Sequence, residues 1–429
     1  MAVVEAVLVG AGNRGRFTYG GFAREHPDRL RLVALAEPDD ERRATVAAEH
    51  GLGPERVFRD FRELLARPAL APVAIIATGD TLHVAPALAA LERGYHVLLE
   101  KPIAPEAGDC VRVVEAAERA GRMLQIGHVL RYAPFYTRVH ALLSSGRIGR
   151  VLTVDMKENV AFWHLTHSYV RGKFRNRTLA APIVLAKTCH DLDLLCWFVG
   201  APAARVSSFG RLSHFRSEDA PKGAPARCTD GCPVQEGCPH DAVRFYVGPD
   251  ERIARAWPWT DVSSDPSREA RRRALERGPY GACVYRCDND VPDHQVLAIE
   301  FEGGATATFT MNGLGSHEKR TIRVTGTEGE LRGVFQDGLL ELSRHGSLGV
   351  ERFEHRGSPF DHFGGDPGLL AHFTDVVARG RPDEVRASGR VSLESHLLGF
   401  AAEASRESGR TIEMATHRQE ARAAAGLAG

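Results

Sequence analysis

The sequence has little that would direct the protein to a membrane or to nucleic acid. No apolar run approaches the roughly 18 residues that a transmembrane helix needs. Lysine plus arginine equals aspartate plus glutamate at 55 each, so no net charge attracts a nucleic acid or an anionic membrane. Residues 1–12 enter a strand pattern without the basic leader and cleavage site of a signal peptide. We therefore expect a cytoplasmic protein, whose eight cysteines would not form a disulfide framework.

The length of 429 residues predicts two domains. In residues 1–127, short apolar segments alternate with helical patterns. Strands are expected at 6–12, 31–38, 73–79, 96–102 and 123–128, and helices at 40–51, 85–94 and 107–121. Apolar strands that alternate with helices are typical of a parallel sheet covered on both faces. The first domain is therefore predicted to be a doubly wound α/β domain.

Residues 128–429 form a second predicted domain, in which apolar and polar residues alternate between glycine-rich turns. This pattern is typical of an antiparallel sheet with one exposed face. Strands are expected at 151–160, 203–214, 294–304, 305–314 and 319–331, and helices at 190–200, 368–380 and 392–409. A segment at about 215–290, rich in arginine and proline, is predicted to be an insertion. The alanine-rich tail from residue 415 is predicted to be loose.

The first strand is followed by a G-x-G-x-x-G motif at residues 10–15. Between a strand and a helix, such glycines allow a tight turn and the close approach of a pyrophosphate. Glu37 ends the second strand, where a carboxylate binds ribose hydroxyls and would repel a 2′-phosphate. This favours NAD, although Arg42 and Arg43 lie nearby and leave NADP as an alternative. The predicted cofactor contacts here are Gly10, Gly12, Asn13, Arg14, Gly15 and Glu37.

The triplet EKP at 100–102, after the fourth strand of such a domain, resembles the Gfo/Idh/MocA family of glucose–fructose oxidoreductases and inositol dehydrogenases. Other segments that resemble this family are residues 77–104, 127–149, 189–200, 326–331 and 363–373. The resemblance implies an NAD(P)-binding domain followed by an α/β domain with an open, mostly antiparallel sheet. In this family that sheet usually mediates a homodimer or homotetramer.

The resemblance also implies roles for particular residues. Lys101 and His190 would lie beside the carbon that receives hydride, and the Lys101–Pro102 bond would be cis. Further cofactor contacts implied by the matching segment are Thr78, His83, Glu100 and Lys101.

Lys101 and His190 suit the chemistry of an alcohol dehydrogenase. Oxidising a secondary alcohol removes a proton as hydride leaves, and the developing alkoxide needs a cation or hydrogen-bond donor within reach. Lys101 can both take up the proton and stabilise the alkoxide, and His190 is the better proton acceptor near neutral pH. Many relatives carry an aspartate four residues before this histidine, where this chain has Ala186 followed by Lys187. Lys187 either enters the pocket, where it would suit a substrate with a carboxylate, or points into solvent.

Residues 162–176 follow the first strand of the second domain, where this family places substrate contacts. Their aromatic rings and multiple hydrogen-bond donors suit a sugar or cyclitol ring, and the alternative is an ordinary polar loop. The predicted substrate residues are His164, His167, Tyr169, Arg171 and Lys187, with Arg131 at the domain crossover as a secondary candidate.

Five cysteines lie in the predicted insertion. Cys228, Cys232 and Cys238 have C-x3-C-x5-C spacing, and Cys283 and Cys287 follow in the sequence CVYRC. Thiolates at short spacings in turns rich in glycine and proline suit a tetrahedral zinc site. We therefore predict a structural Zn²⁺ bound by four of the five. An iron–sulfur cluster and free thiols are the alternatives.

Together these features predict an NAD-dependent oxidoreductase that oxidises or reduces a ring hydroxyl of a sugar, glycoside or cyclitol. The alternative is a glycoside hydrolase with tightly bound NAD⁺, which oxidises C3 transiently, eliminates the leaving group and re-reduces the product. Net formation of NADH distinguishes the two reactions. A third alternative is a non-catalytic protein that binds NAD as a sensor or regulator. The presence of both Lys101 and His190 weakens this alternative.

Overall fold

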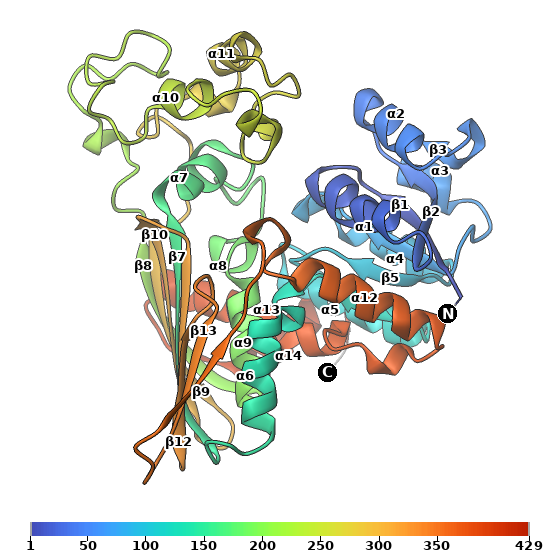
Figure 1. The fold of residues 1–429 in the computed structure, drawn as a ribbon, viewed down its shortest axis with the longest axis vertical. Coiled ribbons are helices and arrows are strands. Elements are labelled where there is room, and N and C mark those ends of the chain that lie inside the picture. The colour runs from blue at the N-terminus through green and yellow to red at the C-terminus, as the bar shows by residue number, and fades with distance from the viewer. Residues whose placement is uncertain (1, 428–429) are drawn as a thin grey trace.

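The computed structural model describes residues 2–427 and contains two large sheets (Figure 1). The N-terminal sheet has six parallel strands in the order β3-β2-β1-β4-β5-β6. They are β1 (Val4–Val9), β2 (Leu30–Ala36), β3 (Val57–Phe58), β4 (Val73–Ile76), β5 (His96–Leu99) and β6 (Leu124–Ile126). Every residue of β4 and β6 is buried, as expected for a sheet covered on both faces. The predicted doubly wound domain is confirmed.

Helices connect these parallel strands. They are η1 (Arg14–Gly20), α1 (Gly21–Glu25), α2 (Asp40–Glu49), η2 (Pro54–Arg56), α3 (Phe61–Leu65), η3 (Asp80–Leu82), α4 (Val84–Glu92) and α5 (Ala107–Arg119). Asp39 begins α2 by accepting a hydrogen bond from the backbone N–H of Arg42 at 2.9 Å. Because all six strands are parallel, the loops that follow β1, β4 and β5 meet at one edge of the sheet. The strand order reverses between β1 and β4, which is where such sheets bind ligands.

The second sheet has nine strands in the order β14-β13-β12-β11-β7-β10-β9-β8-β15. They are β7 (Val151–Ala161), β8 (Ala203–Arg211), β9 (His294–Phe301), β10 (Thr306–Gly315), β11 (Lys319–Gly326), β12 (Gly329–Val334), β13 (Leu339–Arg344), β14 (Val350–Glu354) and β15 (Ile412–Glu413). Only the pairing of β7 with β10 is parallel among the described strand pairs of this sheet. Alternate residues of β9 are buried and exposed, so one face of the sheet packs on the core.

Helices lie on the face of this sheet that is turned toward the N-terminal domain (Figure 1). They are η4 (Val129–Tyr132), α6 (Pro134–Ser144), α8 (Ile183–Ala186), α9 (Cys189–Val199), α13 (Gly389–Ser408) and α14 (Met414–Ala424). Helix α12 (Gly365–Ala378), flanked by η10 (Pro359–Asp361) and η11 (Pro382–Glu384), packs on η4 and beside β1. At one end of the sheet, β7 continues into α7 (Phe162–Leu165) and η5 (Thr166–Arg171). No helix among residues 2–427 is long and apolar enough to cross a membrane.

Two predictions about the second domain are wrong. The tail from residue 415 is not loose, because most of it forms α14, which is held by ion pairs from Arg418 to Glu394 and from Arg422 to Glu115. Residues 319–331 do not form one strand but the hairpin of β11 and β12, because the chain reverses at 327–328. Residues 428–429 of the tail lie outside the described part.

Residues 212–293, which we call the cysteine segment, connect β8 to β9 and contain no strand (Figure 1). The segment holds η6 (Ser217–Asp219), α10 (Ala242–Val247), η7 (Ile253–Arg255), η8 (Trp259–Asp261), α11 (Arg268–Arg277) and η9 (Pro279–Gly281). Ala242, Tyr246 and Leu275 form a small buried cluster within the segment, and other buried side chains, such as Phe215 and Val284, join the main core. In helix α11, Arg271 is fully buried and donates to the carbonyl of Pro249 at 2.8 Å.

Candidate functional site

The turn after β1 has the geometry of a dinucleotide-binding loop. Gly10 has a φ of +93°, and a Cβ there would lie 2.7 Å from the carbonyl oxygen of Ala77. A Cβ on Gly15 would lie 2.0 Å from the carbonyl oxygen of Gly10, so both glycines are required by the protein's own packing. A Cβ on Gly12 would meet nothing within 4 Å, so Gly12 faces open space where the helix begins. A helix N-terminus behind an open backbone fits a pyrophosphate.

Glu37 ends β2 beside this turn. Its carboxylate accepts hydrogen bonds from the backbone N–H groups of Ala11 at 2.6 Å and Asp39 at 3.0 Å, which fix it at the strand end. Arg43 donates to the carbonyl oxygen of Glu37 at 2.8 Å and pairs with Asp40, so its guanidinium is engaged within the protein. This arrangement fits NAD, whose ribose hydroxyls can donate to a fixed carboxylate.

Arg14, which follows Asn13 at the start of the helix, forms a buried link between the domains. Its guanidinium pairs with Glu100 at 2.5 Å and with Asp366 of α12 at 2.8 Å. The hydroxyl of Tyr19 donates to the same Glu100 oxygen at 2.7 Å. Two predicted cofactor contacts, Arg14 and Glu100, are therefore bound to each other in this structure.

Lys101 follows β5 at the edge of the sheet where the glycine-rich turn lies. The Lys101–Pro102 bond is cis, as the resemblance implied. His83 contacts the carbonyl oxygen of Pro102 through Nδ1 at 2.7 Å, and His396 Nε2 accepts from the backbone N–H of Ile103 at 3.0 Å. The backbone after Lys101 is thus held from both sides. Thr78, in the loop after β4, has a buried hydroxyl without a hydrogen-bond partner among the described residues.

The side chain of Lys101 crosses to the second domain. Its Nζ donates to the carbonyl oxygen of Ala186 at 3.0 Å, at the end of α8. His190 lies in the first turn of α9, is buried, and its Nδ1 has no partner among residues 2–427. Burial, and next the positive charge of Lys101, hold the pKa of His190 well below its ordinary value. The site therefore combines an ammonium with a neutral imidazole.

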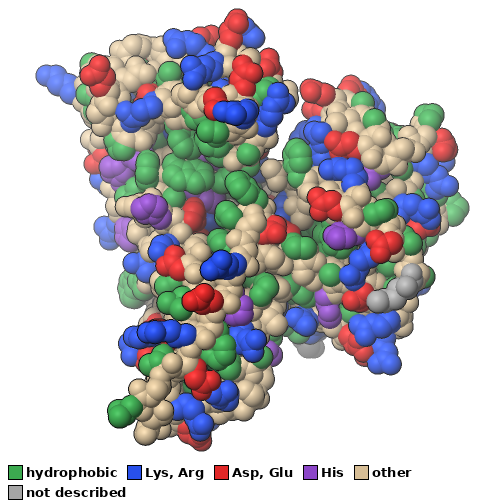
Figure 2. All heavy atoms as spheres, in the orientation of Figure 1, with side chains coloured by type: hydrophobic (Ala, Val, Ile, Leu, Met, Phe, Trp, Pro, Cys, Tyr) green, Lys and Arg blue, Asp and Glu red, His purple; other side chains and the backbone are tan. Residues whose placement is uncertain are grey.

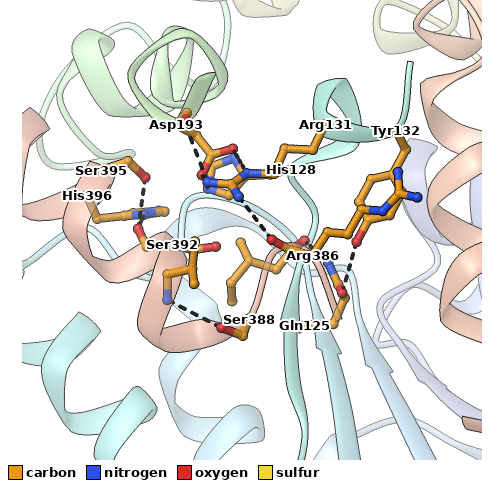
Figure 3. A network of polar contacts seen from close by, with 12 residues as sticks. Gln125, His128, Arg131, Tyr132, Asp193, Arg386, Ser388, Ser392, Ser395 and His396 are labelled. Carbon is orange, nitrogen blue, oxygen red and sulfur yellow. Dashed lines mark hydrogen bonds and ion pairs between the residues drawn. The ribbon is translucent and has the colours of Figure 1, made fainter. Parts of the chain in front are cut away.

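A polar network contacts α9 through Asp193 (Figure 3). Arg131 of η4 binds the carboxylate of Asp193 through Nε at 2.6 Å and Nη2 at 2.8 Å, and it donates to the carbonyl of Arg386 at 3.0 Å. His128 lies beside them, with Nε2 3.9 Å from Asp193. The predicted substrate residue Arg131 thus lies in this buried network.

Lys187 lies in a buried charged cluster. Its Nζ is 3.2 Å from Glu158 and 3.8 Å from Glu318, and its side chain is 12% exposed. Arg320 contacts Glu158 at 2.8 Å and Asp191, next to His190 in the chain, at 2.9 Å. Burial raises the pKa of Glu158, against the opposing effect of both cations. The cluster joins three carboxylates to two cations beside the start of α9.

Glu158, Glu318 and Arg320 were not predicted from the sequence. Glu158 and Arg320 occupy inward positions of β7 and β11, where the neighbouring inward residues are apolar. A charged residue at an inward position of an amphipathic strand is the signal that could have identified them, because buried charges are kept only where they are paired.

The predicted substrate loop divides into two groups. His164 Nδ1 lies 2.6 Å from Glu318, and burial, aided by the charge of Lys187, lowers the pKa of His164 to about 4. Tyr169 is also buried. These residues lie near the charged cluster.

Figure 2 shows a hollow in the surface between the cysteine segment and the N-terminal domain, with hydrophobic side chains beside it.

The other two residues of the loop face the cysteine segment. His167 Nδ1 lies 2.8 Å from the hydroxyl of Tyr246. Arg171 donates to the carbonyl oxygens of Ala282 and His240, each at 2.7 Å. Both side chains thus hold the segment against the sheet domain.

The predicted zinc site is not supported. All eight cysteines are free, and no group of three or more His, Cys, Asp or Glu side chains within residues 2–427 could hold a metal ion. The thiol of Cys287 donates to the carbonyl of Cys283 at 3.4 Å. Sequence spacing indicated that the thiols gather in one region but could not give their separation.

Comparison with known proteins finds relatives of both parts of the chain. Residues 4–128 match the model described as "Oxidoreductase family, NAD-binding Rossmann fold", and residues 140–413 match "Oxidoreductase family, C-terminal alpha/beta domain". The putative oxidoreductase YteT of Bacillus subtilis is 25% identical over 63% of this chain and 62% of its own length. An inositol 2-dehydrogenase of Streptomyces avermitilis is 33% identical over 41% of this chain and 48% of its own length. The chain thus spans about half to three-fifths of these relatives.

Solved structures show the same fold. The oxidoreductase domain protein from Kribbella flavida superposes with a TM-score of 0.71 at 19% identity, covering 96% of this chain and 100% of that one. An oxidoreductase from Agrobacterium radiobacter, in complex with NAD⁺, L-tartaric acid and magnesium, gives 0.68 at 18% identity, covering 96% and 99%. The two family models together span both sheets, and the chain therefore belongs to the Gfo/Idh/MocA oxidoreductase family.

Proposed function

We propose that this protein is an NAD-dependent dehydrogenase that acts on a ring hydroxyl of a sugar, glycoside or cyclitol. The observation that carries the proposal is that Lys101 reaches the second domain four residues before His190. The ammonium of Lys101 reaches Ala186 at 3.0 Å, and the buried, neutral His190 lies one turn further along the chain. Lys101 follows β5 at the sheet edge that carries the open backbone of Gly12.

NAD bound at Gly12 and Glu37 would supply the hydride acceptor for this reaction. The chain's own residues manage the substrate oxygen and its proton. Lys101 donates to the substrate oxygen and stabilises the negative charge that develops on it. His190, unprotonated at neutral pH, accepts the hydroxyl proton. The backbone contacts of His83 and His396 keep Lys101 in place during this step.

The charged cluster favours a substrate with several hydroxyl groups. Lys187 and His164 each place a polar group within 4 Å of Glu318, next to α9. Fixed polar groups of this kind orient a polyhydroxylated ring. The name of the Streptomyces relative, an inositol 2-dehydrogenase, supports the same class of substrate.

The test is incubation of the purified protein with NAD⁺ and a panel of inositols, aldoses and glycosides, with NADH and the oxidised product both quantified. We expect one NADH for each molecule of ketone formed. Release of a leaving group from a glycoside without net NADH would contradict the proposal and support the NAD-dependent hydrolase instead.

A further inference from the structure

Two tryptophans meet where the cysteine segment lies against the loop that follows β7. Trp163 belongs to α7, Trp257 belongs to the cysteine segment, and their ring centres are 5.6 Å apart. The other two tryptophans of the chain, Trp197 and Trp259, pack against apolar clusters. Within residues 2–427, Trp163 and Trp257 join neither cluster and are only partly buried. Their indoles therefore offer apolar surface that the protein's own cores do not use.

The cysteine segment does not depend on these indoles for its attachment to the sheet domain. His167 contacts the hydroxyl of Tyr246, and Arg171 donates to two carbonyl groups of the segment. Phe245 of α10 packs on Trp163 with ring centres 5.7 Å apart, which fixes the orientation of that indole. Aromatic surface that is held in place in this way favours binding, because little freedom is lost when a ligand packs on it.

A fixed hydrogen-bond acceptor lies beside the indoles. The ring centre of His164 is 4.9 Å from that of Trp257 and 5.6 Å from that of Trp163. Because the carboxylate of Glu318 only accepts, Nδ1 of the neutral His164 carries the proton and Nε2 remains an acceptor. Within residues 2–427 this Nε2 makes no hydrogen bond and is not buried, and 17% of the side chain is exposed. An apolar wall beside an acceptor fits a ring with an apolar face and hydroxyl groups at its rim.

Contacts connect this acceptor to the proposed reaction centre. Lys101 donates to the carbonyl of Ala186, and the next residue, Lys187, lies 3.8 Å from the carboxylate of Glu318 that binds His164. The indoles lie beyond His164, on the side of the cysteine segment. Figure 2 shows hydrophobic side chains beside the hollow between that segment and the N-terminal domain. A ring that reacts beside Lys101 would therefore carry its substituent toward the indoles.

We propose that the substrate is a glycoside and that the cysteine segment provides one wall of the site for its aglycone. The aglycone ring, a second sugar or an aryl group, packs on Trp163 and Trp257, while Nε2 of His164 accepts a hydrogen bond from a sugar hydroxyl. The cysteine segment thereby determines which substituent the substrate carries. This inference rests on the proposed function, because it places the reacting ring beside Lys101 and His190.

The first test measures binding and does not require turnover. The full-length protein with NAD⁺ is titrated in a calorimeter with methyl and phenyl β-glycosides of glucose, galactose and xylose, and with cellobiose, lactose and xylobiose. We expect a phenyl glycoside or a disaccharide to bind about fivefold or more tightly than the methyl glycoside of the same sugar. The phenyl and disaccharide arms distinguish an aryl group from a second sugar. Equal dissociation constants within every series, or no binding of any compound, would overturn the proposal.

The same compounds separate this inference from the proposed activity. Formation of NADH from methyl and phenyl glycosides at equal kcat/KM would overturn the aglycone site and leave the dehydrogenase intact. Preferred binding of a phenyl glycoside or a disaccharide without formation of NADH would support the aglycone site and contradict the dehydrogenase.

Variants of the two indoles test the wall itself. Trp257→Ala should remove the preference for the larger glycosides, whereas Trp257→Phe, which keeps an aromatic ring, should retain part of it. The matched control is Ile253→Ala, at an exposed apolar position of the same segment, which should leave the preference unchanged. Trp163→Leu gives an independent test if Trp257→Ala fails to fold. An unchanged preference in Trp257→Ala or in Trp163→Leu would contradict the assignment.

Discussion

The proposed reaction places opposite requirements on two side chains. In it, Lys101 carries a charge near the substrate oxygen, whereas His190 is uncharged so that it can accept a proton. The structure meets both requirements because His190 is buried and lies in the field of Lys101, so its pKa stays well below the ordinary value. The charge of Lys101 therefore helps to set the protonation state in which His190 can act.

Replacement of the ammonium tests the role of Lys101. We expect Lys101→Met to lower kcat/KM by about 10²- to 10⁴-fold, the usual contribution of a positioned acid–base group. NAD affinity, measured by calorimetry, should change little. The matched control is Lys157→Met, an exposed lysine of β7. An equal loss of activity in both variants would refute the assignment.

Cofactor choice is predicted to depend on the charge of Glu37. Glu37→Gln keeps an acceptor for the N–H of Ala11 but removes the charge that repels a 2′-phosphate. We expect the preference for NAD over NADP, measured as the ratio of their Kd values, to fall by at least about tenfold, which corresponds to about 1.4 kcal/mol. Glu41→Gln, on the exposed face of α2, is the control and should leave the ratio unchanged.

At the scale of elements, the sequence was most informative where periodicity is strong. Buried runs such as Val73–Ile76 predicted the parallel strands, and the glycine-rich motif predicted the turn after β1. Helix α14 could not be predicted, since its stability comes from contacts with α5 and α13 that lie far away in the sequence. The pairing of Lys187 with Glu158 and Glu318 could not be predicted either, because it depends on the register between β7 and β11.

Gly368, the last glycine of the sequence FGGDPG, lies where α12 packs closely on η4. A Cβ on Gly368 would lie 2.8 Å from the backbone oxygen of Tyr132, which cannot move without displacing η4. We expect Gly368→Ala to destabilise the protein by about 1–3 kcal/mol, as overpacking usually does. Gly21→Ala, where an added Cβ meets nothing within 4 Å, should be neutral or stabilising. Chemical denaturation of both variants measures the difference, and equal midpoints would argue against tight packing at Gly368.

At the scale of the whole molecule, the interior contains several neutral histidines that are buried or, like His164, partly buried. Burial lowers the pKa of His128 and His164 to about 4 and that of His396 to about 3. In the unfolded chain these side chains take up protons near pH 6.5, whereas in the folded protein they do not until the pH is far lower. The unfolded state therefore binds more protons between these values, and stability must fall as the pH falls.

We accordingly expect the thermal midpoint to decrease from about pH 7 to about pH 5, as this linkage requires. His396→Gln, which removes one of the buried imidazoles, should reduce the slope. His345→Gln, at an exposed position of the turn after β13, should leave it unchanged. Scanning calorimetry across this range measures all three slopes, and a midpoint that rises on acidification would contradict the prediction.

The position of the cysteine segment has a consequence for how this architecture can change. Strands β8 and β9 are antiparallel neighbours, and Arg211 and His294 face each other at the point where the segment leaves and returns. The segment is therefore a module inserted at a hairpin tip. It could be acquired, lost or exchanged without altering the order of any strand, so the part of the protein beside residues 162–176 can diversify while both sheets stay the same.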